Sequence, residues 1–264
     1  MTRPIVFLTD YGLSDAWVGI CHGVMYGIAP DAHVIDLTHA VPRQDVLRGA
    51  IELGRAVEYL PRRAVYLGVV DPGVGSERRA VAVAAGEALL VGPDNGLLSL
   101  AWQALGGAGE AVWIENEELL LTPVSRTFHG RDVFAPAAAH LAAGRPLADL
   151  GPSVDVELLH RLEVPSPMVA PGAVGARVTG VDGFGNVQLN ATLDQLESAG
   201  LAGERVLVVN GRRLPRGGTF AELPEHELGM IVDSDGYLAV VVNHGSAATM
   251  MRLAAGDTVV LERP

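Results

Sequence analysis

The chain has 264 residues, 49% of them hydrophobic, and a formal net charge of −12 at pH 7. This apolar fraction is enough to bury a core, which excludes a disordered chain, and the acidic balance argues against nucleic acid as a partner, because nucleic-acid binders usually carry a basic face. Every basic residue other than histidine is an arginine, which excludes enzymes that use a protein lysine as a Schiff base or in a phosphate-binding loop.

Strand and helix patterns alternate over the first 160 residues. Apolar runs predict strands at residues 5–8, 33–38, 64–70, 80–85 and 89–92. Apolar residues at helical spacing predict helices over 17–28, with Ser14 as a candidate cap, and over 45–59, 97–104 and 133–143. This alternation predicts an α/β domain over residues 1–162, with a mostly parallel sheet flanked by helices.

A different pattern follows the segment EVPSPMVAPG, residues 163–172, whose three prolines indicate a linker. Strands are predicted at 174–181, 187–190, 206–209, 228–233, 237–243 and 258–261. One helix is expected near 192–198 with Thr192 as its cap, and the dipeptide Asp235-Gly236 indicates a hairpin. Residues 173–264 are therefore predicted to form a smaller all-β, barrel-like domain.

The cysteine content and the first residues of the chain predict the cellular location of the protein. Cys21 is the only cysteine, so neither an internal disulfide nor a cysteine-based zinc cluster is expected. The start, MTRPIVFLTDYG, lacks the apolar stretch and cleavage site of a signal peptide. No apolar run reaches the ~18 residues that span a bilayer. A cytoplasmic protein without a membrane partner is predicted.

Two carboxylates stand where predicted parallel strands end. Asp10 follows IVFLT and Asp71 follows AVYLGVV, and each has a glycine close behind it, in TDYG and DPGVG. Ligands of open α/β sheets bind outside the carboxyl ends of the strands, although an aspartate there also suits a plain turn. FHGRD at 128–132 adds His129 before an apolar helix, and VDGFGNVQLN at 181–190 opens the β-domain with a glycine-rich loop.

Five motifs in this order resemble one known family. FLTDYGLSDAWVG, VDPGVGSERR, GPDNGLL, TFHGRDVFAPAAAHLAAG and VDGFGNVQLN are similar to the motifs of the S-adenosyl-L-methionine hydroxide adenosyltransferases, which are related to fluorinases and chlorinases. The resemblance implies an α/β domain followed by a barrel-like domain. It also implies a homotrimer, with each active site between the N-terminal domain of one subunit and the C-terminal domain of the next.

The resemblance also assigns roles to particular residues. The water-activating triad falls on Asp71, Arg78 and His129. The implied substrate contacts are Asp10 for the ribose hydroxyls, Asp15 on the methionine side, Asp182 and Ser234 for the amino group, Phe184 and Phe220 as nearby aromatics, and Asn186 for adenine. Fluorinases carry an arginine where this chain has Asp235.

The implied reaction is hydrolysis of S-adenosyl-L-methionine to adenosine and L-methionine by attack of water at the ribose C5′. The sulfonium leaves without a general acid, so neither a cofactor nor a metal is expected. The water must be held in line at roughly 3–3.5 Å from C5′. A carboxylate or an imidazole can accept its proton, and a fixed arginine can orient the carboxylate.

Three alternatives remain open at this point. Halogenases of the same superfamily place tyrosine at the position of Asp71, where a carboxylate would repel a halide ~4 Å away by about 4 kcal/mol at an effective dielectric constant of 20. A module that binds adenosine or S-adenosylmethionine without turnover would not need the triad. A metal-dependent hydrolase could use Asp10, Asp71 and His129 as ligands.

Overall fold

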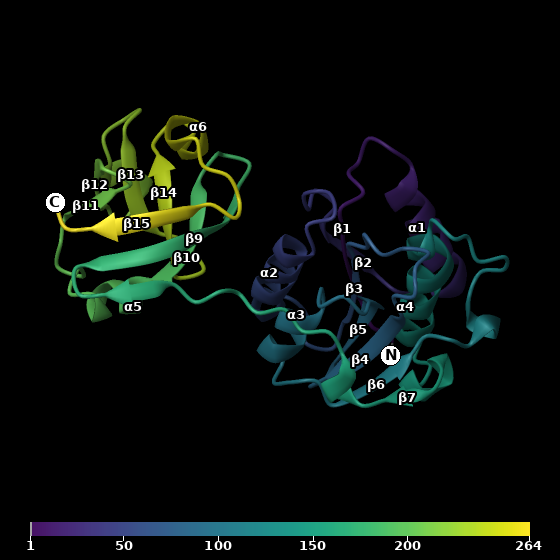
Figure 1. Cartoon of the computed structure of the whole chain (residues 1–264). Coiled ribbons are helices and arrows are strands. Elements are labelled where there is room, and N and C mark those ends of the chain that lie inside the picture. The colour runs from purple at the N-terminus through teal and green to yellow at the C-terminus, as the bar shows by residue number, and fades with distance from the viewer. Residues whose placement is uncertain (1) are drawn as a thin grey trace. The chain divides into compact units, whose positions relative to one another are not determined.

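The computed structural model describes residues 2–264 and divides them into two compact units (Figure 1). The first unit ends at Glu163 and the second begins at Val164. Within residues 2–264, no helix combines the length and the apolar character that crossing a bilayer requires.

The first unit contains seven strands and four α-helices. The strands are β1 Ile5–Thr9, β2 Val34–Thr38, β3 Val65–Val69, β4 Ala80–Ala85, β5 Ala88–Pro93, β6 Glu110–Trp113 and β7 Ser153–Val154. The α-helices are α1 Trp17–Ile28, α2 Val46–Ala56, α3 Ser99–Ala104 and α4 Ala135–Ala142. Short helical turns are η1 Val57–Tyr59, η2 Glu117–Leu119, η3 Gly130–Phe134, η4 Leu147–Leu150 and η5 Val156–Leu158.

One seven-stranded sheet, in the order β2-β1-β3-β5-β4-β6-β7, forms the centre of this unit. The pairs β1–β2, β1–β3 and β3–β5 are parallel, and β4 joins β5 and β6 in antiparallel register. Figure 1 shows α1 and α4 on one face and α2 and α3 on the other. Alternate β1 residues serve the two cores, with Phe7 facing α1 and α4 and Leu8 facing α2 and α3. The predicted α/β domain with helices flanking its sheet is confirmed.

One predicted helix cap and one predicted helix start differ from the structure. Ser14 does not cap α1, which begins at Trp17 with Ala16 at the cap position and no side-chain cap. The helix expected from residue 133 begins earlier, as the π-helical turn η3, and continues as α4. Pro136 has no N–H to donate to the carbonyl of Asp132, and that carbonyl accepts from Leu121 instead.

The second unit is a barrel-like antiparallel sheet. Its strands are β8 Met168–Ala170, β9 Ala173–Val181, β10 Val187–Thr192, β11 Val206–Val209, β12 Arg212–Pro215, β13 Leu228–Val232, β14 Tyr237–Val242 and β15 Thr258–Glu262. Its helical segments are α5 Leu193–Ser198, η6 Phe220–Glu222 and α6 Ala247–Met251. The strand order is β12-β11-β15-β9-β10-β14-β13, and an isolated bridge between Arg216 and Met230 brings the two edges together.

Local sequence signals explain several elements of this unit. Thr192 caps α5 with a capping box completed by Gln195, as the sequence predicted. The expected hairpin joins β13 to β14, and Gly236 adopts a φ of 83° in its turn. The proline-rich segment 163–172 includes a strand, β8, which pairs with β9. Alternate apolar residues of the long strands point inward, and they form one core.

Candidate active site

Two carboxylates lie at the same edge of the first unit's sheet. Thr9, the last residue of β1, pairs with Val69, the last residue of β3, in parallel register. Asp10 follows β1 directly and Asp71 comes two residues after β3. The two side chains therefore start from neighbouring strand ends, at the edge where open α/β sheets bind ligands.

Asp71, Arg78 and His129 form one hydrogen-bonded chain. Arg78 donates from Nε to Oδ1 of Asp71 at 3.0 Å and from its terminal nitrogen NH2 to Oδ2 at 2.5 Å, which is the bidentate fork that arginine makes with a carboxylate. The same NH2 lies 3.0 Å from Nδ1 of His129. The Arg78 and Asp71 side chains are only 8% and 7% exposed, and Arg78 also lies over the ring of Phe134. The fork is therefore shielded from water and held in one geometry.

Arg78 determines which ring nitrogen of His129 carries the proton. Burial and the nearby Arg78 guanidinium lower the pKa of His129, against the opposite influence of Asp71 and Asp132. Because a guanidinium can only donate, Nδ1 must be the acceptor in the 3.0 Å contact. The neutral imidazole then carries its proton on Nε2, so it can donate a hydrogen bond to a molecule at the sheet edge.

A tight glycine loop returns the chain from Asp71 to Arg78. Val74 N–H donates to the Asp71 carbonyl, and Ser76 N–H and Oγ both donate to the Gly73 carbonyl. Gly75 has a φ of +77°, and a Cβ there would lie 2.4 Å from the carbonyl oxygen of Arg126. Glycine is thus required at Gly75 for both its backbone angle and its close packing.

The loop that carries His129 is anchored by a buried charge. Asp132 is 1% exposed, accepts from Ser125 N–H at 2.8 Å and pairs with Arg131. Burial opposes ionisation of Asp132, but the bonds from Arg131 and Ser125 hold its pKa below the ordinary value. Asp132 thus fixes the segment before His129. Gly130 leaves room for Tyr11, whose hydroxyl would lie 2.0 Å from an added Cβ.

Asp10 and Asp15, the other expected site residues of the first unit, lie on the segment between β1 and α1. Asp10 is half-buried, and its Oδ2 accepts from Gln44 N–H at 2.8 Å. Asp15 is exposed on the segment before α1. Tyr11, which was not predicted as a site residue, is partly buried and packs against Phe128, and burial raises its pKa well above the ordinary range. Tyr11 therefore stays protonated, and it packs the Asp10 segment against the loop that carries His129.

The second unit has a pocket of about 490 Å³ that contains three of the expected residues. It is lined by Phe184, Asn186, Phe220, Val242, His244 and Gly245. Phe184 and Phe220 are exposed at 82% and 41%, whereas Asn186 is buried. Two aromatic faces beside one amide can stack on a flat heterocycle and read its edge. His244 was not expected, because no sequence signal distinguishes it from the other histidines.

Asp182 and Ser234 do not meet at this pocket. Asp182 accepts from the N–H groups of Phe184 and Asn186 and from the Asn186 amide, so it holds the loop in shape. Ser234 is exposed in the β13–β14 turn, next to the end of β14 that pairs with Thr192, whereas Asp182 lies beyond the other end of β10. The shared contact to the amino group that the resemblance implies for Asp182 and Ser234 stays a prediction. Ser246, beside Gly185, is the serine near the pocket.

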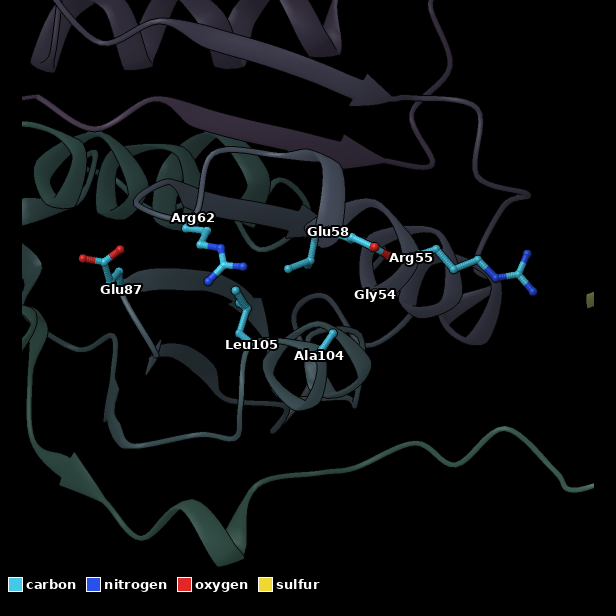
Figure 2. Close-up of a pocket in the computed structure, with 8 residues that line it drawn as sticks. Gly54, Arg55, Glu58, Arg62, Glu87, Ala104 and Leu105 are labelled. Atoms are coloured by element: carbon cyan, nitrogen blue, oxygen red, sulfur yellow. The ribbon is translucent and has the colours of Figure 1, made fainter. Parts of the chain in front are cut away.

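A further cavity of about 410 Å³ lies at the other end of the first unit's sheet (Figure 2). Its lining includes Arg55, Glu58 and Arg62 from the end of α2 and beyond, and Glu87 before β5. Residue Leu89 of β5 pairs with Val65, the first residue of β3, so Asp71 lies beyond the opposite end of that strand. This cavity is therefore separate from the triad.

Comparison with known proteins gives the family. The N-terminal domain model of the SAM hydroxide adenosyltransferases matches residues 5–151, and the C-terminal domain model matches residues 176–260. The chain belongs to the SAM hydroxide adenosyltransferase family. The match spans both units and includes the triad, Asp10 and the pocket residues Phe184 and Asn186.

Members of this family differ in the names they carry. A Salinispora tropica protein named (R)-S-adenosyl-L-methionine hydrolase is 52% identical over 97% of this chain and 96% of its own. A fluorinase from Actinopolyspora mzabensis is 30% identical, over 99% of this chain and 98% of its own. An uncharacterized conserved protein from Thermotoga maritima shares the fold, with a TM-score of 0.89 and 35% identity over 98% of this chain and 100% of its own. The hydrolase is thus much nearer in sequence than the fluorinase.

Proposed function

We propose that this protein hydrolyses S-adenosyl-L-methionine to adenosine and L-methionine. The observation that carries the proposal is the hydrogen-bonded chain of Asp71, Arg78 and His129 at the carboxyl edge of the sheet. The proposal also draws on the 52% identity to a protein named as the hydrolase of this substrate. A module that only binds the substrate would have no use for a buried Asp–Arg fork joined to an imidazole.

The proposed step is an in-line displacement. The oxygen of a water forms a bond to C5′ while the C5′–sulfur bond breaks, and the electron pair leaves with the neutral thioether of methionine. His129 donates from Nε2 to the water oxygen and fixes its direction, because its Nδ1 is occupied by Arg78. Asp71 takes the proton, since each of its oxygens keeps a lone pair beyond the bond to Arg78. Arg78 keeps Asp71 in position and offsets the developing negative charge.

Substrate recognition is proposed to divide between the two units. Asp10 would hold the ribose hydroxyls, and Phe184, Phe220 and Asn186 would hold adenine. We assign Asp182 the task of positioning the Asn186 amide, with which it bonds at 2.8 Å. Asp15, Asp182 and Ser234 remain proposals for the methionine end of the substrate.

We propose that the protein works as a cytoplasmic homotrimer, in which the first unit of one subunit meets the second unit of the next. The support is the family membership alone. Light scattering on the purified chain measures the trimer directly, and a monomeric mass with full activity would contradict shared sites.

The structure weakens the metal-dependent alternative. Both oxygens of Asp71 and Nδ1 of His129 are engaged by Arg78. A divalent cation bound there would have to displace Arg78 from these atoms and leave its shielded guanidinium without a partner, which is costly. We therefore propose that the chemistry proceeds without a metal or cofactor.

Product analysis in isotopically labelled water tests the reaction. We expect adenosine carrying the label in its 5′-hydroxyl, together with methionine, and no 5′-halo-5′-deoxyadenosine when fluoride or chloride is added. The physical reason is that the buried Asp71 carboxylate repels a halide by about 4 kcal/mol at ~4 Å. A halogenated nucleoside as the main product would establish the halogenase alternative.

The ribose role predicts the behaviour of Asp10→Asn. The variant keeps an acceptor for Gln44 N–H but loses charge-assisted bonds to the hydroxyls, so substrate binding should weaken at least roughly tenfold. The wild type should discriminate against a 2′-deoxy substrate, and the variant should not. Normal binding with abolished turnover would instead place Asp10 among the reacting groups.

The protonation state of His129 predicts the pH profile. The donor tautomer requires a neutral ring, and its pKa is lowered from the ordinary value of 6.5. Single-turnover rates should therefore stay constant from pH 8 to below pH 6.5 and fall only as the pH drops through the lowered pKa, because a proton on Nδ1 would face Arg78. A rate that rises with acidity, or that falls already above pH 6.5, would contradict this assignment.

A further inference from the structure

A cluster of two imidazoles and one carboxylate joins α1 to β2, outside the candidate active site. His22 lies on α1, Asp36 lies in β2, and His39 follows β2 directly. His22 Nε2 is 2.8 Å and His39 Nε2 is 3.0 Å from the same oxygen, Oδ1 of Asp36. One nitrogen from each imidazole and one carboxylate oxygen all lie within 4.8 Å of one another.

The inner histidine presents an unsatisfied nitrogen to this cluster. The His39 side chain is 3% exposed, and its Nδ1 lies 2.9 Å from Oγ1 of Thr9. Its Nε2 is buried and has no hydrogen-bond partner, although it lies 3.0 Å from Oδ1 of Asp36. When Nδ1–H donates to Thr9, Nε2 keeps a lone pair close to this carboxylate oxygen, and the contact is repulsive unless a positive charge lies between the two atoms.

The donor atoms fit a divalent transition metal. Imidazole nitrogen and carboxylate oxygen are the ligands that zinc and its neighbours take, and a histidine ligand usually has its other nitrogen bonded to an oxygen, as His39 has to Thr9. Tetrahedral bonds of about 2.0–2.1 Å separate ligand atoms by about 3.3 Å. The two nitrogen–oxygen separations of 2.8 and 3.0 Å need an expansion of only a few tenths of an ångström, and the two imidazole nitrogens lie within 4.8 Å of each other.

We propose that His22, Asp36 and His39 form a binding site for one zinc-type divalent ion. Water would complete the coordination, since the side chains of His22 and Asp36 are 35% and 45% exposed. The bound ion ties α1 to β2 and, through His39 and Thr9, braces the strand end that carries Asp10.

Metal titration of the full-length, tag-free chain tests this site. After treatment with a chelator and its removal, Zn²⁺ is added in a calorimeter and Co²⁺ is followed by its visible absorption. We expect one ion per chain, a cobalt spectrum of low coordination number, and a higher Tm with zinc. His22→Ala and Asp36→Asn should each weaken binding at least about tenfold.

Matched variants keep the result interpretable. His33→Ala removes an exposed histidine just before β2 that is outside the cluster, and it should bind zinc like the wild type. Circular dichroism shows whether each variant is folded, and His22 is the safest substitution because its side chain is partly exposed. Absence of saturable binding by the wild type, or equal binding by His22→Ala, would overturn the proposal. The cluster would then be only a hydrogen-bonded contact between α1 and β2.

Discussion

Asp71→Asn is expected to lower the single-turnover rate of S-adenosylmethionine cleavage by roughly 10²–10⁴-fold, the usual contribution of a positioned general base. The replacement is nearly isosteric, but an amide can neither take the proton of water nor hold both donors of Arg78, which now bond to the two oxygens of Asp71. Substrate affinity should change little, because the ribose and adenine contacts are assigned to other residues. Rapid-quench kinetics, with binding measured in parallel, separates the two effects.

The other members of the triad should behave as parts of one unit. Arg78→Lys should be nearly as damaging, since an ammonium cannot reproduce the fork to Asp71 and the contact to His129. Arg79→Lys is the matched control. Arg79 is the next residue in the chain, and its guanidinium pairs with Glu115 at an exposed position. The double variant Asp71→Asn/His129→Ala should be little worse than the worse single variant. Additive losses in the double variant, or near wild-type turnover of Asp71→Asn, would remove the shared role on the attacking water.

Gly75→Ala should cause the second large loss, although residue 75 has no side chain to take part in chemistry. Its φ of +77° disfavours any side chain, and the added Cβ would meet the carbonyl oxygen of Arg126 at 2.4 Å. Backbone rather than a flexible side chain must therefore move, which shifts Arg78 relative to Asp71. We expect turnover to fall by about 10²-fold, the effect of a misplacement near 1 Å, and stability to fall by about 1–3 kcal/mol.

Substitution of a second glycine distinguishes the effect of backbone strain from the effect of close packing. Gly211 has nearly the same φ, +79°, in the β11–β12 hairpin, but nothing lies within 4 Å of the position its Cβ would take. Gly211→Ala should therefore cost only the conformational strain, about 1 kcal/mol, and leave turnover unchanged. Denaturant unfolding and single-turnover rates are measured for both variants. Equal effects of the two substitutions on turnover would show that the contact with Arg126 does not position the triad.

Many helices and strands of both units could be predicted because their signals are local. Alternating apolar runs and helical periodicity gave β4 and β11 with the observed ends, and Thr192 was recognisable as a cap from its own neighbourhood. Short or amphipathic edge strands such as β7 and β12 were not predicted, because two to four residues carry too little periodicity. The cap of α1 was wrongly predicted, since a serine that suits a cap does not have to act as one.

The sequence by itself determined the family, the order of α/β and β units, and the two aspartates at strand ends, because motifs and strand patterns are properties of neighbouring residues. Only the tertiary structure decided which side chains meet. Arg78 reaches His129 across 51 positions, Ser234 lies away from Asp182, and His22 joins Asp36 and His39. These encounters depend on strand order, on register and on loops closed by a positive-φ glycine, and each requires distant segments to pack before the geometry exists.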